Sequence, residues 1–227
     1  MDPINIIKII TAALTVVISF VVGFHVIRLD PKKLLNRWFT LFFISSSLGF
    51  LFYTIYHLIL NNSQIVILLM IIGQIFFNLI FFSLMMTVFI LEKYEKVAMS
   101  AKYLGTMIAL FIIMSVGYFI WIPTLNMTRY AQGIIDTETP LPWFVMIISI
   151  RAILLIYVVY RYGLMSSKLE GEIKKRVQWF FIGIVFIIIA LLIDLIGGAS
   201  GFILIEALAL IAVDVATLTI FKGFLVR

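Results

Sequence analysis

The sequence predicts an all-α integral membrane protein, folded as a bundle of seven transmembrane helices. Hydrophobic residues make up 64% of the 227 residues, charged residues only 12%, and the mean hydropathy is +1.21. A soluble domain keeps roughly a quarter of its residues charged, so this chain lacks the polar surface that water requires. Apolar runs of about 20 residues, the length that crosses a bilayer, alternate with short polar, proline-bearing or glycine-bearing breaks.

Seven such runs account for nearly the whole chain, which we treat as one transmembrane domain, residues 1–227. Backbone groups in lipid must be paired within the segment, so each run is expected to be a helix. The first run has no basic segment before it and no small-residue cleavage site, which indicates a retained span and no signal peptide. The predicted spans are residues 4–27, 36–60, 65–91, 103–122, 143–162, 177–196 and 202–224.

Lysine and arginine predict how the bundle is oriented. Only Lys8 and Arg129 fall on one side, Arg151 falls inside a span, and the other fourteen of the 17 basic residues fall on the opposite side. Basic residues accumulate in cytoplasmic loops. We therefore expect the N-terminus outside, the C-terminus in the cytoplasm, and a multi-pass protein of the cell membrane. The four tryptophans lie at the predicted boundaries, as an aromatic belt requires.

The loops indicate which partners to expect. Residues 123–142 form an outside loop of about twenty residues, long enough to cap the bundle. Glycosylation triplets begin at Asn61 and Asn126 on the same side. The basic inner loops serve as orientation signals, and they also offer a docking surface for anionic lipid or a cytoplasmic signalling partner. Because topology accounts for the net charge of +6, no nucleic-acid partner is expected.

Polar side chains inside spans are costly, and they are functional candidates by default. From the helical rise, Glu206 lies about 8 Å, Arg151 about 12 Å and Asp214 about 20 Å below the outer boundary. Two interpretations stay open. Arg151 pairs with one of the two acids and ties the fifth and seventh spans together, or the group lines an outward-facing polar cavity that binds a small ligand. The candidate residues for such a buried polar network are Arg151, Glu206, Asp214, Gln74, Asn78, His57 and Asp194.

The remaining candidates differ in depth. Gln74 and Asn78 are one helical turn apart at mid-depth in the third span. His57 and Asp194 lie near the outer edge, where a hydrogen-bonded histidine and an exposed carboxylate are the favoured interpretations. His25 is near the inner boundary, so the two histidines cannot share a metal ion. We expect no metal and no cofactor.

The pattern also argues against catalysis. There is no cysteine, and HExxH, Walker and Ser–His motifs are absent. A pigment similar to the microbial rhodopsins needs a lysine in the middle of the seventh span, but Lys222 lies at its cytoplasmic end. An intramembrane aspartyl protease needs two aspartates at equal depth, whereas Asp194 and Asp214 differ by roughly 15 Å along the membrane normal. We therefore predict that the protein is not an enzyme and has no catalytic residues.

Two segments, LNRWFTLFFISSSLGFLFYTIYHLIL (residues 35–60) and EGEIKKRVQWFFIGIVFIIIALLIDLIGG (residues 170–198), carry a resemblance. They resemble the seven-helix sensor module at the N-terminus of some bacterial and archaeal histidine kinases. Those modules share the predicted orientation, an Asn and a basic residue opening span two, and a basic, aromatic opening to span six. The resemblance implies signal reception through the membrane. No kinase, cyclase or coiled coil follows Arg227, so the expectation is an orphan or truncated module that signals through a cytoplasmic partner.

The alternatives come from other classes of membrane protein. A small transporter or channel would use the same polar residues to line a pathway. Its spans are often broken by Gly or Pro, and here only Gly197-Gly198, at a span end, offers a break. A non-catalytic subunit of a larger membrane complex is the third interpretation.

Overall fold

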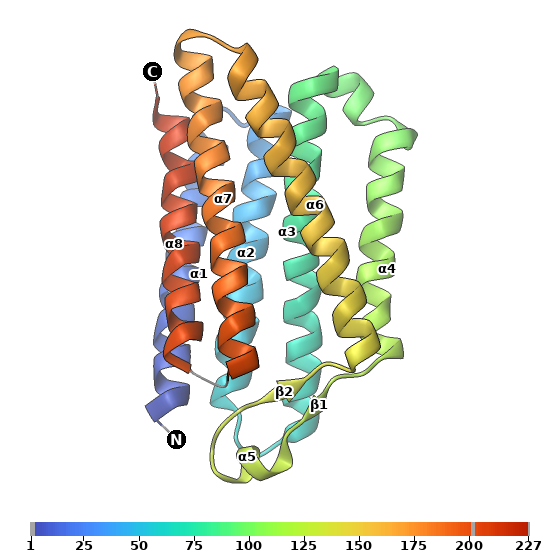
Figure 1. Ribbon diagram of the computed structural model, residues 1–227, viewed down its shortest axis with the longest axis vertical. Coiled ribbons are helices and arrows are strands. Elements are labelled where there is room, and N and C mark those ends of the chain that lie inside the picture. The colour runs from blue at the N-terminus through green and yellow to red at the C-terminus, as the bar shows by residue number, and fades with distance from the viewer. Residues whose placement is uncertain (1–2, 201–202, 227) are drawn as a thin grey trace.

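The computed structural model describes residues 3–200 and 203–226, without the side chains of residues 4, 198–200, 203, 204 and 206. This part of the chain is almost entirely helical, and a two-stranded antiparallel sheet lies in the long loop (Figure 1). The elements in chain order are α1 (Pro3–Leu29), α2 (Leu34–Leu58), α3 (Ser63–Ala98), the π-helical turn η1 (Ala101–Gly105), α4 (Thr106–Ile120), β1 (Thr124–Leu125), α5 (Met127–Ala131), β2 (Thr137–Glu138), α6 (Leu141–Lys168), α7 (Gly171–Ser200) and α8 (Ile203–Leu225).

Seven helices in the described chain are long and apolar enough to cross a membrane, which confirms the predicted fold class. They are α1, α2, α3, α4 together with η1, α6, α7 and α8. The predicted spans largely coincide with them, but α3, α6 and α7 continue for about one to two further turns at one end, where the charged residues are. We call this the basic end, and the opposite end, with residues 59–62 and 121–140, the loop end. The orientation of the two ends in the membrane stays a prediction.

The polar segment that was expected to end the third span instead continues α3 through a break. Tyr94 has φ 63° and ψ 156°, a backbone conformation that residues other than glycine rarely adopt. The helix resumes after it and ends at Ala98. The backbone N–H of Leu34 donates a hydrogen bond to the Glu95 side chain (3.3 Å), which links this turn to the start of α2.

The seven long helices form two adjoining groups. In the first group, α8 packs on α7 and α1, and α1 packs on α2. In the second, α4 and α6 pack on α3, which joins the first group through α2. Figure 1 shows α7 standing between α6 and α8. The prediction that the fifth and seventh spans are neighbours is therefore wrong, because those spans are α6 and α8.

Two close helix contacts depend on glycine. A Cβ atom on Gly117 would lie 2.0 Å from the indole ring of Trp143, and one on Gly183 would lie 2.4 Å from the Ile220 side chain. These glycines let α4 approach α6 and let α7 approach α8, as small residues commonly do in membrane bundles.

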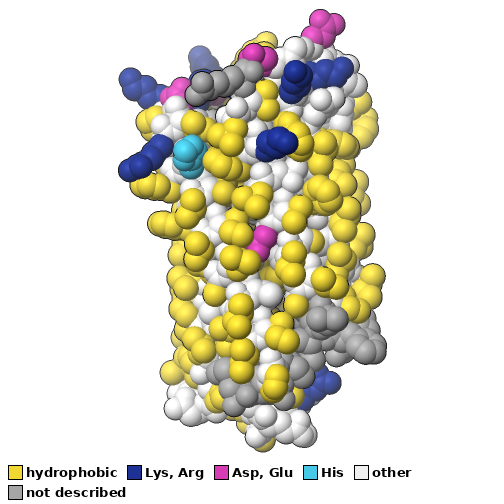
Figure 2. Space-filling view, turned by 90° about the vertical axis from the view of Figure 1, so that its left-hand side faces the viewer, with side chains coloured by type: hydrophobic (Ala, Val, Ile, Leu, Met, Phe, Trp, Pro, Cys, Tyr) yellow, Lys and Arg dark blue, Asp and Glu magenta, His cyan; other side chains and the backbone are white. Residues whose placement is uncertain are grey.

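The outside of the bundle is also apolar. Large side chains such as Ile10, Ile120 and Ile153 are well exposed along the helices. Figure 2 shows this apolar belt on the face nearest α1 and α8, with lysine and arginine side chains gathered mostly at the basic end and acidic colour inside the belt. Such a continuous apolar surface is unfavourable in water. The helices are therefore in contact with a lipid bilayer.

Residues 121–140, which we call the cap segment, close the loop end. Thr124 pairs with Glu138 and Leu125 with Thr137, and the short helix α5 lies between the two strands. Leu125 and Ile135 are buried against Tyr56, Val66 and Met70 of α2 and α3. The cap segment thus crosses from α4 and α6 to the ends of α2 and α3 (Figure 1).

Candidate functional site

Arg151 of α6 lies at the centre of a polar network between α3, α4 and α6. Its Nη2 atom donates to Gln74 Oε1 (2.9 Å) and to Asn78 Oδ1 (2.6 Å), and its Nε atom also donates to Asn78 Oδ1 (3.2 Å). Tyr118 of α4 completes the network, because its hydroxyl lies 3.5 Å from Arg151 Nη2 and donates to Gln74 Oε1 at 3.0 Å. The structure thus brings together three of the predicted site residues, Gln74, Asn78 and Arg151.

This network solvates a positive charge with neutral oxygens. A guanidinium group keeps its charge in proteins and has five donors but no acceptor, so it requires oxygen atoms around it. The amide group of Asn78 is held in place because its Nδ2 atom donates to the Met114 carbonyl oxygen (2.9 Å), which turns Oδ1 towards Arg151. The ring of Phe81 lies 5.5 Å from the guanidinium carbon and adds a cation–π contact.

The predicted pairing of Arg151 with a carboxylate of the seventh span is wrong for Asp214. All hydrogen bonds of the Arg151 side chain in the described structure go to α3 and α4. Asp214 lies on α8, on the far side of α7 (Figure 1). The side chain of Glu206, the other predicted partner, lies outside the described residues.

Asp214 faces α1 and forms a second polar region. Its side chain is only 6% exposed, the hydroxyl of Thr15 faces it, and its Oδ1 atom has no hydrogen-bond partner among the described residues. Thr15 and Ser19 on α1 and Thr217 on α8 are also buried. We call these side chains, with Asp214, the hydroxyl seam.

His57 is buried at the loop end, beneath the cap segment. Its Nδ1 atom is 2.8 Å from the Tyr53 carbonyl oxygen, and its ring lies against the rings of Tyr53 and Tyr56, at centroid distances of 4.2 and 4.4 Å. Lys8 of α1, also buried, is close enough for its charge to act on the imidazole. The expected hydrogen-bonded histidine is therefore present, although it is buried. The Asp194 side chain is exposed near the loop end of α7, as expected.

Sequence reasoning did not single out the hydrogen bonds that join the cap segment to α1. Asn5 Nδ2 donates to the Gly133 carbonyl oxygen (2.8 Å), and the backbone N–H of Ile135 donates to Asn5 Oδ1 (3.4 Å). Asn5 and Lys8 lie one turn apart on the buried face of α1. That spacing was the available signal, since two polar residues on one face of an apolar helix indicate a contact inside the protein.

An ion pair at the basic end was also missed. Arg161 of α6 donates through Nε and Nη2 to the two carboxylate oxygens of Glu92 on α3. One turn away from Glu92, the Thr87 and Tyr162 hydroxyls are 2.9 Å apart. The predicted spans placed Glu92 just past the end of the third span and Arg161 in the last turn of the fifth, and no sequence pattern indicated that α3 and α6 bring the two side chains together.

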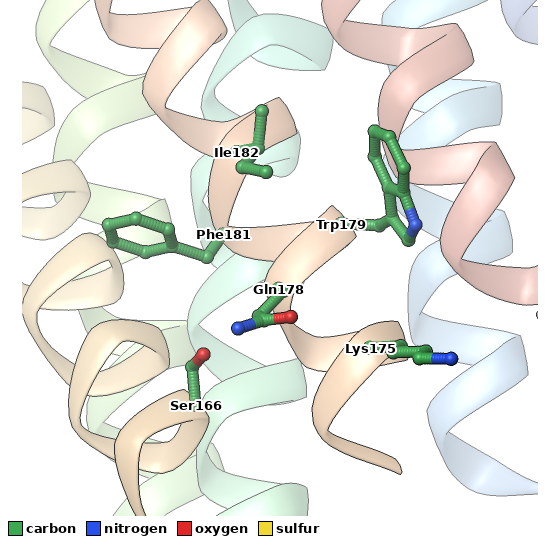
Figure 3. Close-up of a pocket in the computed structure, with 6 residues that line it drawn as sticks. All are labelled: Ser166, Lys175, Gln178, Trp179, Phe181 and Ile182. Carbon is green, nitrogen blue, oxygen red and sulfur yellow. The ribbon is translucent and has the colours of Figure 1, made fainter. Parts of the chain in front are cut away.

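Two cavities open at the basic end. The larger, about 450 Å³, is a groove between α6 and α7, in which Ser166 and Gln178 lie near each other and Trp179, Phe181 and Ile182 provide apolar walls (Figure 3). Lys175 supplies a positive charge at its edge. A groove with this combination suits the phosphate and acyl chain of an anionic lipid or an acidic, amphipathic segment of a partner.

The second cavity, about 340 Å³, lies between α1, α2, α7 and α8, and Asp30, Lys33 and Arg176 are among its lining residues. The backbone N–H of Lys32 holds the pKa of the Asp30 carboxyl below its usual range, and the charge of Lys33 lowers that pKa further. Asp30 is therefore ionised at neutral pH. Both cavities are at the basic end, so the predicted outward-facing cavity stays a prediction.

No model of a known protein family matches this chain, and no curated protein matches it. The resemblance to histidine-kinase sensor modules consequently rests on the two sequence segments alone. Within the described residues, no three or more His, Asp and Glu side chains come together as a metal site.

Proposed function

We propose that this protein is a receptor-like membrane module without enzymatic activity, in which an event at the cap segment is passed along α1 to a partner at the basic end. The observation that carries the proposal is the pair of hydrogen bonds from Asn5 to Gly133 and Ile135. They connect the cap segment directly to the first turn of a membrane-spanning helix. A small molecule or protein that displaces the cap segment would therefore act on α1 first.

α1 has the geometry of a relay. It continues without a break from Pro3 to Leu29, and Leu29 lines the second cavity at the basic end. Along this length it is bonded to α2 through a few hydrogen bonds, from Ser47 to the Val16 carbonyl (3.0 Å) and from Thr40 to the Gly23 carbonyl (3.4 Å). Coupling between distant sites needs a rigid element with two arrangements. α1 supplies the rigid element, and breaking these few bonds would allow the second arrangement.

In this proposal the basic end faces the cytoplasm, as the distribution of lysine and arginine predicts. A reporter fused after Arg227 should then be cytoplasmic, and a tag at Gln132 should be reachable from outside. Protection of Gln132 from outside reagents would reverse the orientation. The partner would be a cytoplasmic protein with an acidic surface, docking where the two cavities lie.

The relay is testable because the chain has no cysteine, so single labels can be introduced freely. An environment-sensitive fluorophore on Lys33→Cys, in the second cavity, should change its emission when Asn5→Ala removes both bonds to the cap segment. The matched control is Thr124→Val, which removes only an exposed hydroxyl of the cap segment that lies 3.5 Å from the Glu138 carbonyl. Gel filtration would show that each variant is folded.

A second label distinguishes a relay along α1 from a change confined to the cap segment. A second label on Gln132→Cys reports the cap segment itself. If Asn5→Ala changes the emission of the label at position 132 while the emission of the label at position 33 is unchanged, α1 does not relay the event and the proposal fails.

One observation favours a carrier as the second candidate. It is the buried Asp214 oxygen, which has no hydrogen-bond partner among the described residues, since transporters keep such groups along their pathways. Purified protein in liposomes should show no flux of protons, alkali ions or small metabolites above that of empty vesicles if the receptor proposal is right. Flux that disappears in Asp214→Asn would favour transport.

A further inference from the structure

The hydroxyl seam between α1 and α8 contains a buried carboxyl group that the proposed relay does not use. We propose that Asp214 is a proton-binding site in the middle of the membrane domain. Its carboxyl group carries a proton while α1 and α8 are packed together and releases it when water reaches the seam. This inference stands independently of the signalling proposal.

The position of Asp214 follows from the packing of α8 on α1. The ring of Phe221 contacts the ring of His25 on α1, with centroids 5.2 Å apart. Both helices run from the loop end to the basic end (Figure 1). Asp214, about two turns before Phe221, therefore lies level with the stretch of α1 that contains Thr15 and Ser19. All three side chains are nine-tenths buried or more.

The Thr15 and Ser19 hydroxyls of α1 have hydrogen-bond partners other than Asp214. The Thr15 hydroxyl has one hydrogen and donates it to the Thr11 carbonyl oxygen (3.2 Å), and the Ser19 and Ser46 hydroxyls bond to each other (3.4 Å). An ionised carboxylate only accepts hydrogen bonds, and a Thr15 hydroxyl that turned to donate to it would give up its bond to the Thr11 carbonyl oxygen. A protonated carboxyl group can donate its own hydrogen to the free lone pair of the Thr15 oxygen. The seam therefore suits the neutral acid.

No cation on the described helices around Asp214 lies at its depth. The nearest ionisable residues of α1 are Lys8 and His25, about 10 Å and about 15 Å along the helix from Thr15. The part of α7 between Arg176 and Asp194 has no ionisable residue. On α8 itself, Lys222 is two turns away, with its ammonium group over the Trp179 ring at 4.0 Å, and the Glu206 side chain is not described. An ionised Asp214 would thus lie buried with its Oδ1 atom unbonded and with no cation of the described residues at its depth, which is costly in a membrane.

A proton fits this site better than a metal cation. Sodium sites in membrane proteins use several oxygen ligands, including carbonyl groups released where a helix is unwound. α1 and α8 are continuous helices at this level, so their carbonyl groups bond within the helix. The carboxyl group of Asp214 and the hydroxyl groups of the seam remain. A proton needs only the carboxyl group, whereas a sodium ion needs several of these oxygens to turn towards it at once.

The test uses dicyclohexylcarbodiimide, an apolar reagent that modifies protonated carboxyl groups within membranes. The acid transfers its proton to a carbodiimide nitrogen, its oxygen bonds to the central carbon, and rearrangement leaves a stable N-acylurea that mass spectrometry locates. In the full-length protein in liposomes we expect modification at Asp214, decreasing at least tenfold as the pH is raised. Asp214→Asn should abolish it, and Glu172→Gln, which removes an exposed carboxyl of α7, should leave it unchanged.

Infrared spectroscopy provides a second measurement that needs no reagent access. The carbonyl stretch of a protonated carboxylic acid should be present in the wild type, absent in Asp214→Asn, and lost on raising the pH. Absence of this band from the wild type at acidic and neutral pH would overturn the proposal. Protection of Asp214 from the carbodiimide by sodium chloride, but not by choline chloride, would also overturn it and assign a sodium site instead.

Discussion

Arg151 and Asp214 are both charged residues inside apolar helices, yet the protein surrounds them in opposite ways. Arg151 donates hydrogen bonds to oxygen atoms of α3 and α4 from two of its three nitrogens. Asp214 lies in the other group of helices and has a buried oxygen with no hydrogen-bond partner in the described chain. The helices that carry them, α6 and α8, lie on opposite sides of α7 (Figure 1), and no hydrogen bond joins the two side chains in the described structure.

The difference follows from what each group can do with its charge. A guanidinium group cannot lose its proton in a protein, so a fold that buries it must also bury acceptors. A carboxyl group can become neutral by taking up a proton, so a fold can bury it with little more than a hydroxyl group nearby. The amide side chains of α3 are the acceptors for the Arg151 guanidinium group, and Thr15 on α1 is the hydroxyl group beside the Asp214 carboxyl group.

The largest loss of stability should come from removing Asn78, the acceptor that takes two of the Arg151 hydrogen bonds. Asn78→Leu leaves the guanidinium group without its bonds at 2.6 and 3.2 Å, and it should lower the free energy of unfolding by about 3 kcal/mol. Arg151→Leu removes the charge itself and should cost less, about 1.5 kcal/mol. Thermal or denaturant unfolding in detergent measures both.

The double variant distinguishes this explanation from a simple loss of packing. Asn78→Leu combined with Arg151→Leu should be less destabilised than the sum of the single variants by at least about 1 kcal/mol. Gln178→Leu, a half-buried amide in the groove of α7, should change stability by no more than about 0.5 kcal/mol. If the losses of unfolding free energy in the two single variants add up in the double variant, the Asn78 side chain does not stabilise the Arg151 guanidinium group.

The second effect concerns Asp214 and depends on pH. Below about pH 4, where the carboxyl is protonated in both the folded and the unfolded chain, Asp214→Asn replaces one neutral group by another of the same shape and should change little. Above that pH the carboxyl ionises in the unfolded chain while the folded protein keeps its proton, so the wild type should lose about 2 kcal/mol of stability relative to the variant between acidic and neutral pH. A difference between the two proteins that is the same at all pH values would contradict this account.

A smaller effect is expected at the basic end, where a true ion pair provides a reference. The Glu92 side chain is 8% exposed and that of Arg161 is 30% exposed, so Glu92→Gln should cost about 1.5 kcal/mol, with part of the pair still screened by water. Asp30→Asn breaks the exposed pair with Lys33 (3.5 Å) and should have no measurable effect. Equal losses in the two variants would show that burial does not set the strength of these pairs.

The smallest effect should come from Tyr118→Phe. It removes a hydroxyl that is 3.0 Å from Gln74 Oε1 and 3.5 Å from Arg151 Nη2, while Asn78 still solvates the charge. Interhelical hydrogen bonds in membranes contribute about 0.6 kcal/mol on average, and a loss of that size is expected in the same unfolding experiment. A loss as large as that of Asn78→Leu would mean that Tyr118 orients the whole network.

The fold was largely predictable because hydropathy and helix length are local properties of the chain. Seven apolar runs formed seven helices, because backbone groups in a bilayer must be hydrogen-bonded within the segment. The long loop predicted between two of these runs forms the cap segment. Because Gln74 and Asn78 are one helical turn apart, the sequence predicted that both side chains lie on the same face of their helix. Their partner Arg151 was on the candidate list, but the bond between them was not predicted.

What the sequence alone determined is the depth of each polar residue, since depth follows from position along a helix of known rise. Which residues meet at that depth was decided only by the order of helices in the bundle. With α7 between α6 and α8, Arg151 turns to the amides of α3, Asp214 turns to Thr15 of α1, and Asn5 reaches the cap segment. That order depends on close contacts such as Gly117 with Trp143 and Gly183 with Ile220. These are steric fits between segments far apart in the chain, and no local pattern encodes them.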